Sequence, residues 1–149
     1  MSWLPEGFEH PGRVELSRGH HLRPIRESDV EIDYPAVMGS RERLWSIYGD
    51  AWGWPPTTMT LEQDREDLAR HEREIEAHES FNYALLDEGE TSLLGCVYLD
   101  PPREADEDVV CSWWVVDDLV GSPLERALEA FVLRWLAGTW GFRAPSFGP

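Results

Sequence analysis

The stretch from Val109 to Leu136 constrains the fold more than any other part of the chain, because it joins a strand, a turn and a helix. Val109 to Val116 is an unbroken run of residues that favour β-structure, as is typical of a strand covered on both faces. Ser122 can cap a helix, Glu125 can close a capping box, and Pro123 suits the first helical position. The stretch therefore predicts a central strand that leads through a tight turn into a helix.

The helix after this turn carries apolar residues at helical spacing. They form one broad face, which predicts that the helix packs on the sheet. These residues are Leu124, Ala127, Leu128, Phe131, Val132, Trp135 and Leu136. The turn itself is the predicted ligand site, because the first N–H groups of a helix have no partner within the helix.

The length and charge of the chain limit the classes of function. Residues 1–149 fit a single domain. The net charge is −16, and every fixed positive charge is an Arg. This acidity argues against nucleic acid or an anionic membrane surface as a partner, and it favours cationic small molecules or basic proteins.

The remaining composition predicts a cytoplasmic protein without a metal. The first residues lack the pattern of a signal peptide, and no apolar run has the length of a membrane span. Cys96 and Cys111 lie in apolar segments and are expected to be buried, reduced thiols. His71 and His78 are two helical turns apart, so we expect them on the surface or at the edge of an apolar stripe.

The N-terminal part predicts a leader, a strand and two helices. Residues 1–19 are rich in Pro, Gly and Glu and are expected to form an irregular leader. Residues 20–26 predict a strand, and Pro24 indicates either an edge strand or an early strand end. A helix is expected over 27–38, with Gly39 ending it, and a second short helix over 40–48.

Aromatic residues gather around the next segment, residues 49–59, which is expected to be a loop. They could line a substrate-binding pocket, or they could cover the core of the domain. These residues are Trp45, Tyr48, Trp52 and Trp54.

The middle of the chain predicts a long helix and an antiparallel meander. Thr60 and Gln63 form a capping box that opens a charged helix to about Glu79, most of which is expected to face water. Strands are expected at 81–86, 92–99 and 109–116.

Details of the strands and of the chain end complete this prediction. Gly95 predicts a bulge or a close approach of two backbones. Folding the second strand onto the third places Cys96 near Cys111 or Ser112. One short strand, limited by Pro145, is expected within the last ten residues.

The order of these elements resembles the GNAT superfamily of acyl-CoA-dependent N-acetyltransferases. Three places carry the resemblance: His21-Leu-Arg-Pro-Ile-Arg-Glu-Ser-Asp29, the strand pair with Leu93-Leu-Gly-Cys-Val-Tyr98, and Trp114 to Leu128. The resemblance implies an α+β fold, with a mixed and mostly antiparallel sheet flanked by helices. Its C-terminal part is shortened relative to the family.

The resemblance also implies a function and a binding site. The function is transfer of an acetyl group from acetyl-CoA to the amine of a small molecule or a protein. The strand would bind the pantetheine arm through its backbone, and the turn would hold the pyrophosphate. The residues so implied are Trp114, Val115 and Val116 for the strand, and Gly121, Ser122 and Leu124 for the turn.

The turn departs from the family pattern, in which a Gln or Arg stands where this chain has Asp118. Asp117 adds a second carboxylate, and Pro123 removes one N–H. One carboxylate at about 6 Å from a phosphate charge opposes it by about 2–3 kcal/mol at an effective dielectric constant near 20. The sequence therefore predicts either weakened CoA binding or a different bound species. A GNAT-like binding or regulatory domain without catalysis is the alternative function.

No residue is assigned as the catalytic acid or base from the sequence. Asp100, Asp108, Glu107 and Tyr98 are available near the second and third strands, and the acidic ones could equally form a solvated hairpin tip. The sheet edge left by the short C-terminus needs cover, either from the leader or from a homodimer that completes the sheet.

Overall fold

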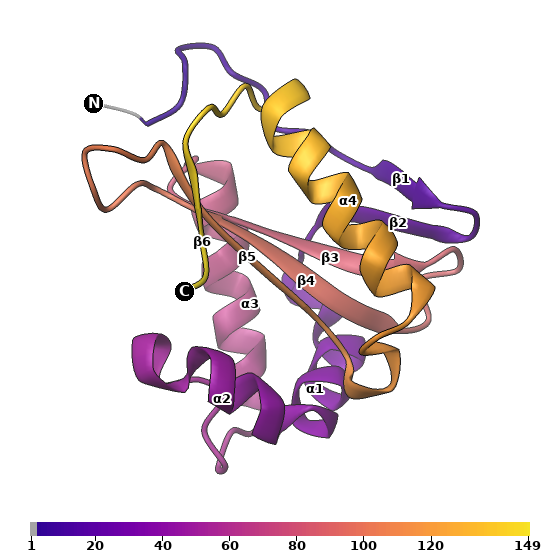
Figure 1. Ribbon diagram of the computed structural model, residues 1–149. Coiled ribbons are helices and arrows are strands. Elements are labelled where there is room, and N and C mark those ends of the chain that lie inside the picture. Colours follow the sequence, from indigo (N-terminus) through magenta and orange to yellow (C-terminus); the bar gives the residue numbers. More distant parts are fainter. Residues whose placement is uncertain (1–2) are drawn as a thin grey trace.

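The computed structural model describes residues 3–149 as a six-stranded sheet with helices on both faces (Figure 1). The strands lie side by side in the order of the sequence. All neighbours are antiparallel except the last pair, which is parallel. The predicted mixed, mostly antiparallel α+β sheet is therefore confirmed. The strands are β1 Val14–Ser17, β2 His20–Pro24, β3 Phe81–Asp87, β4 Leu93–Asp100, β5 Val109–Val115 and β6 Pro145–Phe147.

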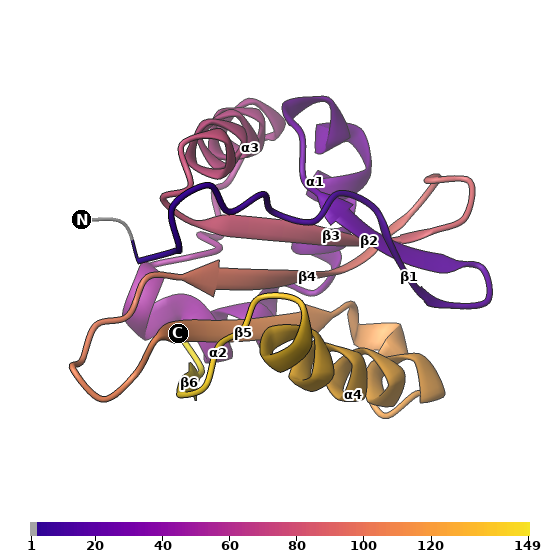
Figure 2. The same cartoon turned by 90° about the horizontal axis from the view of Figure 1, so that it is seen from above.

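Four helices cover the two faces of the sheet. Helix α4 lies on the face opposite α1 and α3 (Figure 2). Successive side chains of a strand point to opposite faces of the sheet, so both faces can pack on helices. On one face, Tyr83 of β3 packs on Trp135 of α4, and on the other, Tyr98 of β4 packs on Tyr48 of α2. Within residues 3–149, no helix combines the length and apolar character that a bilayer span needs. The helices are α1 Val30–Gly39, α2 Arg41–Trp52, α3 Leu61–Glu76 and α4 Pro123–Gly138.

A buried cation fixes the start of α1 against the sheet. The Arg23 guanidinium on β2 lies 2.8 Å from Asp29 Oδ1 and 2.9 Å from Glu90 Oε1. These hydrogen bonds raise the pKa of Arg23 and lower that of Glu90 to about 2. The pairs join β2, the hairpin between β3 and β4, and the 3-10 turn that leads into α1. They thereby set where α1 presents its side chains.

The N-terminal elements correct one prediction and decide between the two alternatives of another. Residues 14–17 form β1, so the predicted leader is irregular only up to residue 13. Strand β2 lies between β1 and β3, so it is not at the edge. Its early end at Pro24 is confirmed. Of the two alternatives for Pro24, the early strand end is therefore the correct one. The edge strand is β1, whose residues alternate between apolar and polar but lie in a stretch that its Pro, Gly and Glu content assigned to the leader.

The helices largely follow their predicted caps. Thr60 and Gln63 form the predicted capping box of α3. Helix α2 runs on to Trp52 and ends at Gly53, which has a left-handed φ of 61°, so the predicted loop starts four residues late. At α4, Ser122 caps the helix as predicted, but the Glu125 carboxylate accepts a hydrogen bond from another N–H, so the predicted capping box does not form.

The register of β4 and β5 corrects the predicted neighbours of the first cysteine. Cys96 lies opposite Trp114, and Cys111 lies opposite Leu99. The predicted register was wrong because the connection between the strands closes on the pair of Asp100 and Val110, which displaces β5 along β4. The predicted close approach at Gly95 is confirmed, since a Cβ there would lie 2.2 Å from the Trp114 carbonyl oxygen.

Candidate functional site

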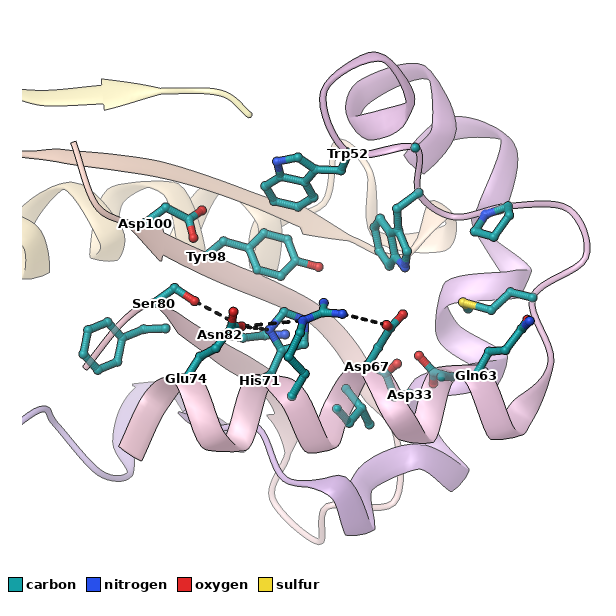
Figure 3. Close-up of a pocket in the computed structure, with 18 of the residues that line it drawn as sticks. Asp33, Trp52, Gln63, Asp67, His71, Glu74, Ser80, Asn82, Tyr98 and Asp100 are labelled. Carbon is teal, nitrogen blue, oxygen red and sulfur yellow. Dashed lines mark hydrogen bonds and ion pairs between the residues drawn. The ribbon is translucent and has the colours of Figure 1, made fainter. Parts of the chain in front are cut away.

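A pocket of about 530 Å³ lies between α3, the segment after α2, and the ends of β3 and β4 (Figure 3). We call it the acidic pocket, because carboxyl groups dominate its charged lining. Aromatic rings form much of the remaining lining. The carboxyl groups belong to Asp33, Asp64, Asp67, Glu74 and Asp100, and the rings to Trp52, Trp54, His71, Phe81 and Tyr98.

One end of the acidic pocket holds a buried pair of carboxyl groups. Asp33 on α1 and Asp64 on α3 are 3% and 2% exposed and share a hydrogen bond. Burial raises the pKa of both groups, and the Asp67 charge adds to the effect. Apart from Asp33, no donor among the described residues reaches Asp64 Oδ2. This end is therefore rich in acceptors and poor in donors.

The other end of the acidic pocket is formed by the end of α3 and the strands. The Ser80 hydroxyl donates to Glu74 Oε1 over 3.3 Å. Asn82 is 3% exposed, and its Oδ1 has no donor among the described residues. Burial, followed by the nearby Glu74 charge, raises the pKa of Asp100 to about 6. A carboxyl group with this pKa can hold and release a proton near neutral pH.

The aromatic wall contains two of the four residues predicted to bind substrate. Trp52 stacks on Tyr48 at 4.5 Å and meets Tyr98 edge-on at 5.1 Å. Trp54 meets Tyr48 at 5.7 Å, and both Trp side chains line the acidic pocket. Tyr48 itself is fully buried behind them, so it supports this wall. Trp45 does not line the pocket, because it points outward from α2 and packs beside Arg41.

His71 is a lining residue that the sequence analysis placed at the surface or a stripe edge. Burial, followed by the Arg70 charge, lowers the pKa of His71 to about 4, so the ring is neutral at pH 7. Asp64, Asp67, His71 and Glu74 follow one another at helical spacing and share one face of α3. That polar stripe was the available signal, but a charged helix face normally indicates solvent. His78 lies elsewhere, with its Nε2 3.0 Å from His10 Nδ1.

The predicted pantetheine-binding strand has a partly uncovered edge. β6 pairs with β5 only as far as Cys111, so in the described part of the chain no strand covers β5 beyond that point. An arginine from α2 reaches this edge, where the Arg43 Nη2 donates to the Val115 carbonyl oxygen and Nε lies 2.7 Å from Asp117 Oδ1. Trp114 was also predicted to bind the pantetheine arm, but its backbone faces β4 and not the uncovered edge, and its indole N–H donates to the Tyr98 hydroxyl.

The predicted pyrophosphate turn satisfies its own donors. The N–H groups of Leu119, Val120 and Ser122 donate to carbonyl oxygens within the turn. The Gly121 N–H donates to Glu125 Oε1 over 2.8 Å. Helix termini bind anions through unpaired N–H groups, so in this arrangement the turn offers a phosphate few donors. Arg126 brings a cation to the turn, where its Nη1 donates to the Gly121 carbonyl oxygen.

The acidic residues after β4 divide into two groups. Asp108 accepts hydrogen bonds from the backbone N–H groups of Arg143 and Ala144, and Glu107 accepts one from the backbone of Arg103. These two carboxylates organise loops outside the acidic pocket. Tyr98 and Asp100 instead line the pocket, which leaves them as the candidates for chemistry.

Comparison with known proteins identifies the fold. No family model matches the chain, and no curated protein matches it in sequence. Among solved structures, it is similar to the apo form of RimL, a ribosomal L7/L12 alpha-N-protein acetyltransferase, with a TM-score of 0.67 and 14% identity over 92% of this chain and 71% of that one. These values show likeness in fold at very low sequence identity.

Two further acetyltransferases show the same likeness. The ribosomal-protein-S5-alanine acetyltransferase of Vibrio fischeri has a TM-score of 0.63 and 16% identity, covering 87% of this chain and 69% of its own. The microcin C7 self immunity acetyltransferase MccE, solved with acetyl-CoA and AMP, has a TM-score of 0.69 and 9% identity, covering 87% and 69%. The chain therefore has the GNAT fold, which confirms the resemblance at the level of the fold.

Proposed function

We propose that this chain is a GNAT-type N-acetyltransferase that transfers an acetyl group from acetyl-CoA to an amine held in the acidic pocket. One observation carries the proposal. The pocket ends at Tyr98 and Asp100 of β4, and Tyr98 pairs with Ser112 of β5, the first residue beyond the part of β5 that β6 covers. An amine in the pocket would thus lie one strand away from the open backbone edge of a GNAT fold.

The pocket residues support the acceptor half of this reaction. Transfer to an amine requires loss of a proton from the ammonium form. Asp100, with a pKa of about 6, is ionised at neutral pH and is placed to accept that proton. Trp52 and Trp54 offer ring faces to a cationic or alkyl group, and Asp67 adds negative charge. These residues would bind, orient and deprotonate the acceptor.

The residues around β5 fit CoA in part. The edge of β5 beyond Cys111 is open to a pantetheine arm, which would bring the reactive thioester carbonyl. The turn accepts a pyrophosphate only after Glu125 releases the Gly121 N–H, and the edge is fully open only after Arg43 leaves the Val115 carbonyl oxygen. Both groups are side chains, and their release frees one N–H of the turn and one carbonyl oxygen of β5.

The occupied turn also favours a second candidate, a GNAT-fold domain that binds an amine without transferring an acetyl group. The carboxylates of Asp117 and Glu125 lie where a pyrophosphate would need positive charge, and they cost affinity. In this candidate, the acidic pocket keeps its ligand chemistry and the cofactor site is lost.

Calorimetry separates the two candidates. Titration with acetyl-CoA is expected to give measurable heat and thermal stabilisation at millimolar concentration, because even weak binding to the folded state raises stability. Mass spectrometry of a panel of amines incubated with acetyl-CoA then detects the acetylated product. Absence of both binding and product would contradict the transferase and leave the amine-binding domain.

A further inference from the structure

Two buried acceptors in the acidic pocket are short of hydrogen-bond donors. Among the described residues, Asn82 Oδ1 has no donor and Asp64 Oδ2 has none apart from Asp33, and both side chains are almost fully buried. Both residues line the pocket. Leaving a buried acceptor unsatisfied is costly, so such atoms in native proteins usually face an ordered water, an ion or a bound group. A ligand that donates hydrogen bonds would satisfy both atoms.

The two acceptors lie in different parts of an elongated pocket. The pocket follows α3 from Gln63 to Glu74, which at 1.5 Å per residue is about 16 Å of helix. Figure 3 shows Asp33 and Asp67 near one end, and Glu74 and Asp100 near the other, with Asn82 on the side of Glu74. Each end thus pairs negative charge with one of these acceptors.

The middle of the pocket already holds a cation of the protein itself. The Arg70 Nη1 lies 3.0 Å from Asp67 Oδ1, and its Nε lies 3.8 Å from Glu74 Oε1. The side chain is 51% exposed, so it can leave without a large loss of buried contact. A donor group that spans these two carboxylates is therefore compatible with the pocket, with Trp52 on the opposite wall (Figure 3).

We propose that the acidic pocket recognises a linear diamine or polyamine, with one ammonium group at each end and an alkyl chain between them. One ammonium lies among Asp33, Asp64 and Asp67, and the other lies between Glu74 and Asp100. The methylene groups run beside the Trp rings. Asp67 and Glu74 are seven residues apart, about 10 Å along the helix, which suits a chain of eight to ten atoms in extended form.

This inference rests on the proposed function in one respect, namely that this pocket is the acceptor site. It does not require the transfer step, because binding of the amine can be measured without acetyl-CoA. A single ammonium, such as a protein N-terminus, would satisfy only one end of the pocket. The competing outcome is therefore equal binding of molecules that carry one charge.

Calorimetry without CoA tests the requirement for two charges. The probes are 1,8-diaminooctane, the monoamine octylamine and the short 1,3-diaminopropane, at about 0.15 M salt to screen non-specific attraction to an acidic protein. The long diamine is expected to bind about tenfold or more tightly than either other probe, because only it pairs with both ends. Equal affinities, or no binding of the long diamine at millimolar concentration, would overturn the inference.

Matched variants on α3 test the position of the site. Asp67→Asn is expected to weaken 1,8-diaminooctane binding about tenfold and octylamine binding less. Glu62→Gln removes the same charge from the same helix at a side chain that is 71% exposed and outside the pocket, and it should change affinity by less than about twofold. Equal losses in the two variants would show non-specific charge attraction and overturn the inference.

Two further variants test the pocket. Arg70→Ala removes the resident cation and should strengthen diamine binding. Asn82→Leu should reduce the preference for 1,8-diaminooctane over octylamine; if this variant does not fold, the result with Asp67→Asn tests the position of the site. Binding of the diamine without acetylated product would uphold the inference and contradict the transferase. Acetylation of octylamine and 1,8-diaminooctane with equal kcat/KM would uphold the transferase and contradict the inference.

Discussion

The Glu125 carboxylate accepts a hydrogen bond from the Gly121 N–H at 2.8 Å, across the turn where a GNAT fold would hold a pyrophosphate. Gly121 adopts a left-handed φ of 79°, which turns this N–H toward the start of α4. The chain thus places a carboxylate at the turn that we propose as the pyrophosphate site. Under this proposal, the side chain of Glu125 competes with CoA for the Gly121 N–H.

Replacing Glu125 with Ala is expected to strengthen CoA binding. The change frees the Gly121 N–H and removes a negative charge near the phosphates, and together these effects should raise affinity about tenfold at low salt. Isothermal titration with CoA measures it. Glu129→Ala removes a charge from the same helix at an exposed position and controls for net charge. Unchanged affinity in Glu125→Ala would mean that the turn is not the phosphate site.

Asp100 should control the pH dependence of acetyl transfer. If Asp100 is the base, kcat should rise as pH increases through about 6, where this carboxyl group ionises. Asp100→Asn should lower kcat about a hundredfold and remove this limb of the pH profile. Steady-state rates across pH 5–8 measure it. Asp106→Asn, exposed in the same loop, is the control. A profile unchanged by Asp100→Asn would exclude it as the base.

Local signals in the sequence predicted the helices and strands well, whereas the sequence did not predict contacts between distant residues. The capping box at Thr60 and the N-cap at Ser122 depend on residues within one turn, so they can be recognised from spacing alone. The register of Cys96 depends on how a loop closes in space, and no local pattern encodes it. The contact of Arg43 with Val115 joins residues far apart in the chain.

The candidate site shows the same division. Trp52 and Trp54 were predicted to bind substrate because aromatic residues cluster in a short segment, and both side chains line the pocket. His71 and Asp64 were missed, because hydropathy cannot distinguish a polar helix face that lines a pocket from one that faces water. Pairing of Asp64 with Asp33 requires the packing of α1 on α3, which only the three-dimensional structure supplies.

Gly95 should be indispensable for the contact between β4 and β5. A Cβ there would lie 2.2 Å from the Trp114 carbonyl oxygen, which is backbone and cannot yield without disturbing the sheet. We expect Gly95→Ala to lower the free energy of unfolding by about 2–4 kcal/mol. Gly138→Ala, at the end of α4 where no heavy atom lies within 4 Å of the added Cβ, is the control and should be neutral or slightly stabilising. Urea denaturation compares them, and a destabilisation of similar size in both would contradict the steric argument.

The buried Asp33 should make the chain less stable as pH rises. Burial, followed by its hydrogen bond with Asp64, raises the pKa of Asp33 well above its ordinary value of 3.8. Between 3.8 and the raised pKa, the folded chain keeps a proton that the unfolded chain has lost, so each pH unit costs up to about 1.4 kcal/mol of stability. Asn carries no such proton but can still donate to Asp64. The advantage of Asp33→Asn over the wild type should therefore grow from pH 4 upward.

Urea denaturation of wild type and Asp33→Asn at several pH values between 4 and 8 measures this effect. Because the net charge also changes, Asp50→Asn at an exposed position of α2 provides the matched variant. The pH-dependent difference in the free energy of unfolding should be larger for Asp33→Asn than for Asp50→Asn. Since Asp33 lines the acidic pocket, a bound diamine should reduce the slope in the wild type by stabilising the ionised carboxyl group. A difference that stays constant with pH would show that Asp33 releases its proton equally in the folded and unfolded chains.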